Sequence, residues 1–148
     1  MSATPQELSR LHRTLTRHHR CRHHRIASEL GLYYGQPVIL LLLADHPQIS
    51  QTELAERLHN TPASVAVSVK RMEKAGWLTK TPDPADARRN VLQLTDAGLA
   101  LAHRCRTAWD AVDRQLYVGF TQDEMDVLAN LFSRMDENLT RPEAETKG

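Results

Sequence analysis

The stretch from Ile49 to Thr95 constrains the fold of this 148-residue chain more than any other. It opens with two short amphipathic patterns, which His59 and Asn60 separate. Two strand-like runs follow, on either side of a loop rich in Pro, Asp and Arg. Helix, turn, helix and hairpin in this order are typical of a winged helix-turn-helix, a module that places one helix in a DNA groove.

The residues at the helix boundaries support this interpretation. Ser50 and Glu53 fit a capping box, in which each side chain satisfies a free amide of the first helical turn. Thr61 followed by Pro62 predicts the start of the second helix, because threonine caps well and proline fits the first helical position. We expect this helix to end near Gly76, which can adopt a left-handed C-terminal cap.

The second helix has two different faces. Val65, Val69 and Met72 recur at helical spacing and predict the buried face. Small residues near its start and cations further along suit a helix that approaches base edges and phosphates. The residues turned away from the buried stripe, or along its edges, are Ala63, Ser64, Ala66, Val67, Lys70, Arg71 and Lys74.

The predicted hairpin has strands at residues 77–81 and 90–94 and a tip at residues 82–89. Arg88 and Arg89 fall where an arginine can reach a minor groove, and Asp86 either orients Arg88 or caps the turn. The predicted DNA-binding residues are therefore Thr61, Ala63, Ser64, Val67, Lys70, Arg71, Asp86, Arg88 and Arg89.

The run DPADARRNVLQLTDAG resembles the wing signature of the MarR family of transcriptional regulators, and the similarity extends from roughly residue 30 to residue 98. Its pattern is D-x-R, several apolar residues, and then L-T-x-x-G, matched by Asp86, Arg88, Leu94, Thr95 and Gly98. The resemblance implies a homodimer joined through its N- and C-terminal helices. Ala66 and Val67 differ from the family, where these positions are often polar, so the operator sequence does not follow from the resemblance.

The flanking segments predict long helices around this module. Residues 4–7 and 121–124 fit capping boxes at the start of the first and last of them, and the last carries an apolar stripe over residues 125–139. We expect a mainly α fold with a small β-wing: a winged helix-turn-helix core with N- and C-terminal dimerisation helices. The resemblance implies that residues 1–148 form one MarR-like domain, with a DNA-binding lobe at 36–95, dimerisation helices at 4–31 and 96–139, and a flexible tail at 140–148. The run from Val38 to Leu43 is apolar on all sides, so we expect that helix to be buried.

Charge is unevenly distributed, although the net charge is only +1. The net charge is +4 for residues 1–30 and +3 for residues 61–95, but −2 for 31–60 and −4 for 96–148. A basic winged segment beside an acidic C-terminal half is expected of a DNA binder whose other part faces a partner. The apolar run Val38–Ala44 is too short to span a bilayer and no secretory signal is visible, so we expect a cytoplasmic protein without a membrane partner.

An effector pocket is predicted near the first helix, where aromatic and polar side chains gather. A small aromatic or anionic effector suits such residues, with ordinary packing of the aromatic rings as the alternative. The predicted pocket residues are His19, His23, Tyr33, Tyr34 and Trp109.

Two other interpretations of the same helix stay open. Cys21 has arginine and histidine neighbours that favour a thiolate, as in a redox sensor, whereas Cys105 lies on an apolar stripe and fits a core position. His19 and His23, at i and i+4, can share a metal ion, but no carboxylate nearby in the sequence completes a ligand set. We therefore predict no metal site and no cofactor.

The sequence predicts a homodimeric transcriptional regulator that binds double-stranded DNA. We expect a repressor that a small molecule or an oxidant releases from a palindromic operator. The alternative is a metal-responsive regulator or metal-binding helical protein that uses the His/Cys patch. No arrangement of nucleophile, base and acid is visible, so we do not expect an enzyme. The effector, the operator and the regulated genes do not follow from the sequence.

Overall fold

The computed structural model describes residues 2–33, 35–86 and 88–141. Tyr34, predicted to line a pocket, and residues 142–148 of the predicted tail lie outside the described residues. The chain divides into two compact units, residues 1–112 and 113–148. Within the described residues, no helix combines the length and apolar character needed to cross a membrane.

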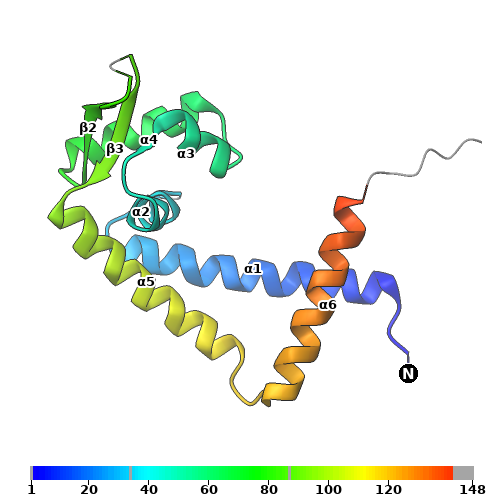
Figure 1. The fold of residues 1–148 in the computed structure, drawn as a ribbon. Coiled ribbons are helices and arrows are strands. Elements are labelled where there is room, and N and C mark those ends of the chain that lie inside the picture. Colours follow the sequence, from blue (N-terminus) through cyan, green and yellow to red (C-terminus); the bar gives the residue numbers. More distant parts are fainter. Residues whose placement is uncertain (1, 34, 87, 142–148) are drawn as a thin grey trace, which may run out of the picture. The chain divides into compact units, whose positions relative to one another are not determined.

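The first unit begins with the long helix α1, Pro5–Glu29, and the short helix α2, Gln36–Asp45. The predicted capping box starts α1: the Glu7 amide donates to the Thr4 hydroxyl at 3.2 Å, and the Thr4 amide donates to the Glu7 carboxylate at 2.8 Å. Figure 1 shows α2 between α1 and the group formed by α3, α4 and the wing.

Helix α2 supplies much of the interior of this unit. Ile39, Leu40 and Leu43 are each at most 2% exposed, as the apolar run predicted. The helix is mostly buried, as expected from its apolar residues, but Val38 is 39% exposed. A helix covered on one side by α1 and on the other by the winged group still leaves a strip between them open.

The helix-turn-helix follows the predicted boundaries. Helix α3 covers Gln51–Arg57 and helix α4 covers Pro62–Lys74. The chain reverses between them at His59, which takes a positive φ of 50°. Gly76 ends the pair with a φ of 78°, the left-handed conformation expected there, which a residue with a Cβ rarely adopts.

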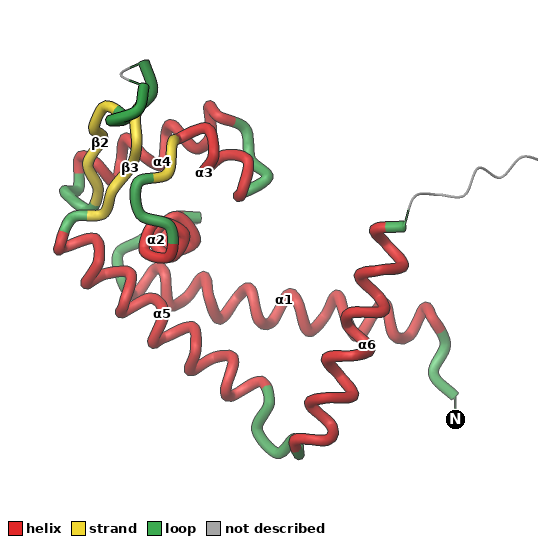
Figure 2. Tube along the Cα trace, viewed as in Figure 1, coloured by secondary structure: helices red, strands yellow, loops and turns green. Residues whose placement is uncertain are grey.

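The wing belongs to a three-stranded antiparallel sheet in the order β1-β3-β2. Strands β2, Leu78–Pro82, and β3, Asn90–Leu94, are the predicted hairpin, with β2 shifted by one residue (Figure 2). Strand β1, Ile49–Ser50, was not predicted. It pairs with β3 through Ile49–Leu92 and Ser50–Val91, so the wing is joined directly to the start of α3.

The core of the first unit collects one face from each element. Val65, Val69 and Met72 of α4 are at most 1% exposed, as their spacing predicted. Leu54, Leu78, Leu92 and Cys105 belong to the same cluster, so α3, the sheet and α5 share it. Burial raises the pKa of the Cys105 thiol, consistent with the predicted core position rather than a reactive one.

Helix α5, Asp96–Leu116, starts against the end of the helix-turn-helix. The Thr95 hydroxyl donates to the Gly76 carbonyl at 2.6 Å and accepts from the Gly98 amide at 3.1 Å. A Cβ on Gly98 would overlap the Trp77 carbonyl oxygen and lie 3.2 Å from a Leu94 methyl group. The glycine of the L-T-x-x-G pattern therefore permits a close approach between α5 and the Trp77 backbone.

The second unit contains the end of α5 and helix α6, Gln122–Thr140. The predicted capping box is present, because the Glu124 amide donates to the Thr121 hydroxyl at 3.3 Å and the Thr121 amide donates to the Glu124 carboxylate at 2.8 Å. No residue of α6 is buried, although its apolar stripe is the one expected from the sequence.

Replacing Gly98 by alanine tests the close approach. Alanine normally stabilises a helix relative to glycine by about 1 kcal/mol, but here overpacking should destabilise the fold by about 1–3 kcal/mol. Urea unfolding followed by circular dichroism measures the difference. Ala100→Gly, at an exposed position of the same helix, calibrates the propensity term. A more stable Gly98→Ala variant would contradict the tight contact.

Candidate DNA-binding surface and pocket

The face of α4 opposite the core is open to solvent. Ala63, Ser64, Val67, Lys70 and Arg71 are all exposed, and Val67, an apolar side chain, is 55% exposed. Because the buried stripe determines how the helix is rotated, these side chains are directed away from the core. The structure thus places five of the predicted DNA-binding residues on one accessible helix.

The first turn of α4 is held by its cap. The Thr61 hydroxyl accepts a hydrogen bond from the Ser64 amide at 3.3 Å, and the Thr61 carbonyl accepts from the Val65 amide at 3.2 Å. Further along, the Arg71 guanidinium lies 5.3 Å from the centre of the Tyr33 ring. Cation–π attraction therefore restrains Arg71, while among the described residues the Lys70 side chain has no hydrogen bond or ion pair.

The tip of the wing is a network of short-range hydrogen bonds. The Asp86 carboxylate accepts from the Arg88 amide at 3.0 Å, and the Asp83 carboxylate accepts from the Ala85 amide at 2.8 Å. Of the two roles considered for Asp86, the structure shows the cap of the turn. Arg88 is exposed, and its guanidinium has no hydrogen bond or ion pair within the described part of the chain.

Arg89 differs from its neighbour because it is directed to the start of α3. Its Nη2 donates to the Ser50 hydroxyl at 3.2 Å and lies 4.0 Å from a Glu53 carboxylate oxygen. The Ser50 backbone amide and hydroxyl hold the pKa of Glu53 below its usual value, with smaller attractions from Arg89 and Arg57. Of the two predicted wing arginines, one thus has partners within the lobe.

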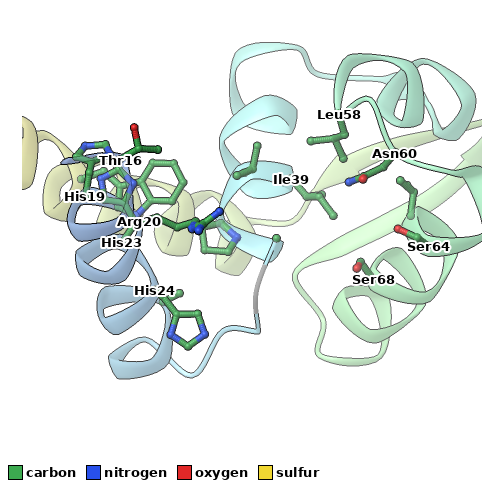
Figure 3. A pocket seen from close by; sticks show the side chains of 16 residues that line it. Thr16, His19, Arg20, His23, His24, Ile39, Leu58, Asn60, Ser64 and Ser68 are labelled. Carbon is green, nitrogen blue, oxygen red and sulfur yellow. The ribbon is translucent and has the colours of Figure 1, made fainter. Parts of the chain in front are cut away.

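A pocket of about 560 Å³ opens between α1 and the helix-turn-helix. Figure 3 shows His19, Arg20, His23 and His24 of α1 on one side, with Ser64 and Ser68 of α4 on the other. The remaining lining residues are Thr16, Ala27, Gly35, Pro37, Val38, Ile39, Leu58, Asn60, Val65 and Trp109.

Three of the predicted effector residues come together in this pocket. The rings of His19 and His23 are 4.2 Å apart, and His23 is stacked on Trp109 at 4.3 Å and an interplanar angle of 4°. The Trp109 Nε1 is buried and, among the described residues, has no hydrogen-bond acceptor. An aromatic wall with a buried donor and an arginine beside it suits a ligand that carries hydrogen-bond acceptors.

Other residues lie differently from the sequence-based prediction. Tyr33 is 66% exposed beneath Arg71 and is not among the residues that line the pocket. Ser64, which is exposed on α4 and predicted to face DNA, also contributes to the pocket wall. Sequence reasoning missed most of the pocket lining, including the polar residues Asn60, Ser68 and His24. Cys21 is exposed on α1, outside the pocket lining.

Known proteins resemble both the sequence and the fold. A profile of the MarR family matches residues 32–89. The chain is 30% identical to the transcriptional regulator HosA of Escherichia coli O111:H- over 100 residues, which cover 68% of this chain and 74% of HosA. It is also 30% identical to the HTH-type transcriptional repressor Mb2911 of Mycobacterium bovis over 112 residues, covering 76% and 78% of the two chains.

Among solved structures, the S. aureus MepR–DNA complex has the same fold. The TM-score is 0.78 at 19% identity, and the match covers 93% of this chain and 99% of that chain. MarR-family proteins regulate transcription and are not enzymes. The match to the family profile, the identity to HosA, and the helix-turn-helix with its wing show that the chain belongs to the MarR family of DNA-binding transcriptional regulators.

Proposed function

We propose that the chain is a homodimeric repressor that a small molecule releases from a palindromic operator. The observation that carries this proposal is the exposed face of α4, which presents Val67, Lys70 and Arg71 on the same lobe as the exposed Arg88 of the wing. An apolar side chain suits the methyl group of thymine, and the cations suit flanking phosphates. The name of Mb2911 as a repressor supports this direction of regulation.

Exposed apolar faces support a dimer. In the first unit, Leu8, Leu11 and Leu15 of α1 are 42–57% exposed. In the second unit, Leu131 and Phe132 are 43% and 40% exposed, with Val127 and Met135 beside them on α6. Apolar stripes of this length on two helices indicate contact with another protein surface, and a second copy of the chain would cover them symmetrically. Two-fold symmetry would place the half-sites roughly 34–36 Å apart along the DNA.

The pocket supports the effector. Its walls include α1 and, through Ser64 and Ser68, the helix proposed to enter DNA. An aromatic ring of a ligand can pack against the stacked rings of His23 and Trp109, and an anionic group of the ligand can pair with Arg20. Such a ligand regulates DNA binding if it has different affinities for the DNA-bound and free arrangements of these helices.

Lys70→Ala tests the DNA-binding face. On an operator selected from random duplexes, the variant should bind roughly tenfold more weakly and show a shallower dependence of affinity on salt, since a phosphate contact is lost. Fluorescence anisotropy at several salt concentrations measures both quantities. Arg114→Ala removes the same charge from an exposed position of α5 and serves as the control. Equal losses in the two variants would contradict a specific role for α4.

Leu131→Glu tests the dimer. A charge in an apolar interface should shift the chain toward the monomer and strongly weaken binding to the two-half-site operator, because a monomer can hold one half-site only. Sedimentation velocity gives the oligomeric state. Asn130→Glu adds the same charge at a neighbouring exposed position and should leave the dimer intact. A wild-type chain that sediments as a monomer would refute this part of the proposal.

Arg20→Ala tests the effector pocket. In a panel of aromatic carboxylates and matched neutral amides, wild type should release its operator preferentially with carboxylates. The variant should need about tenfold more carboxylate, because the charge-assisted hydrogen bond is lost. Operator release measured by anisotropy gives the response, and Arg22→Ala on the same helix is the control. A panel that leaves operator binding unchanged would argue against a small acidic effector.

A further inference from the structure

Arg88 and Arg89 are adjacent, equally charged and both exposed, yet their surroundings differ. In the sequence, both were predicted to contact DNA, and only Arg88 belongs to the D-x-R pattern. In the structure, the Arg88 backbone amide donates to the Asp86 carboxylate at 3.0 Å. Within the described residues its guanidinium makes no hydrogen bond or ion pair. Arg89 is engaged at three points.

Two of these points lie on the Arg89 backbone. Its amide donates to the Asp86 carbonyl at 2.9 Å, and its carbonyl accepts from the Asp83 amide at 2.8 Å. Arg89 therefore closes the turn at the wing tip just before β3 begins. These two hydrogen bonds fix the Arg89 backbone to the same turn that carries Arg88.

The third point is the side chain, which reaches across the sheet to the start of α3. Its Nη2 donates to the Ser50 hydroxyl at 3.2 Å and lies 4.0 Å from the Glu53 carboxylate. Ser50 is opposite Val91 on β3, so Arg89 is its diagonal neighbour across the two strands, within reach of a long side chain. The hydrogen bond joins segments 39 residues apart.

The acceptor is itself rigid. Ser50 is 4% exposed, and its hydroxyl also accepts from the Glu53 amide at 3.1 Å as the N-cap of α3. Its own amide donates to the Glu53 carboxylate at 2.9 Å. A cation beside the amides of a helix N-terminus would by itself be unfavourable, and the Glu53 carboxylate offsets that repulsion. Ser50, Glu53 and Arg89 thus form one charge-balanced cluster, referred to below as the wing clasp.

We infer that Arg89 is a positioning residue: through the wing clasp it holds the wing against the first turn of α3, so that Arg88 alone of the two meets the DNA. This inference rests on the proposed DNA contact of the wing. A wing held in place before binding needs less ordering on the DNA, so the clasp raises affinity without a phosphate contact of its own. Loss of the clasp should therefore weaken binding without changing its salt dependence.

Three single variants and one double variant separate positioning from contact. Arg88→Ala and Arg89→Ala remove the same charge from adjacent residues. Ser50→Gly removes the acceptor of the clasp and no charge, and glycine is tolerated at an N-cap with little loss of helix stability. Arg89→Ala with Ser50→Gly completes a double-mutant cycle. Two quantities are measured: operator affinity at several salt concentrations, and hydrogen–deuterium exchange of residues 78–94 without DNA.

Arg89→Ala and Ser50→Gly should each weaken operator binding about fivefold, a typical value for one hydrogen bond, with an unchanged salt slope. The double variant should be no weaker than either single variant, because both remove the same contact. Arg89→Ala and Ser50→Gly should each speed hydrogen–deuterium exchange in residues 78–94. Arg88→Ala should leave exchange unchanged and lower the salt slope by about 0.9, the value for one phosphate contact.

Two results would overturn the inference. In the first, the salt slope of Arg89→Ala falls as much as that of Arg88→Ala, and Ser50→Gly binds the operator with wild-type affinity. Arg89 would then contact a phosphate directly. The other is unchanged exchange of residues 78–94 in Arg89→Ala. A wild-type chain that does not bind duplex DNA would refute the proposed function. Hydrogen–deuterium exchange is measured without DNA, so it would still show whether the wing clasp holds the wing.

Discussion

Burial of one face of α4 is the constraint on which the rest of the DNA-binding lobe depends. Val65, Val69 and Met72 are almost completely removed from water, and each apolar side chain of this size contributes roughly 1.5–3 kcal/mol when buried. Rotating α4 about its axis would expose this stripe to water and bury the charges of Lys70 and Arg71. Both changes are unfavourable, so they oppose the rotation. The cations are held outward by the hydrophobic face behind them.

Besides the shared hydrophobic core, polar contacts and a close backbone approach connect this lobe to α5. Arg106 donates to the Asp45 carboxylate at 2.6 Å, which joins α5 to the end of α2. The Thr95 hydroxyl and the absence of a Cβ at Gly98 bring the start of α5 against the chain just after α4. Because the pocket is lined by α1 on one side and by α4 on the other, a ligand there would contact both the long helix and the proposed DNA-reading helix.

Much of the fold follows from local signals. The capping boxes at Thr4, Ser50 and Thr121 are confirmed because their hydrogen bonds join residues three apart and need no tertiary partner. The left-handed Gly76 and the buried stripe of α4 are confirmed for a related reason: a helix end and a helix face depend on residues within a few turns.

The candidate site was only partly predictable. His19, His23 and Trp109 were expected near one another, and the structure brings them together, although Trp109 is distant from both histidines in the sequence. Tyr33 was placed with them on composition alone, and it lies under Arg71 instead. Composition indicates which side chains suit a ligand, but not which surface they share.

The sequence by itself determined the order of helices and hairpin, their capped ends and the face of α4 that is buried, because each depends on short-range periodicity or on hydrogen bonds between near neighbours. Only the tertiary structure decided the pairing of β1 with β3, the opening of a pocket against Ser68, and the different surroundings of Arg88 and Arg89. Each of these depends on contacts between segments far apart in the chain, and two adjacent arginines carry no local signal of which partner the fold brings to them.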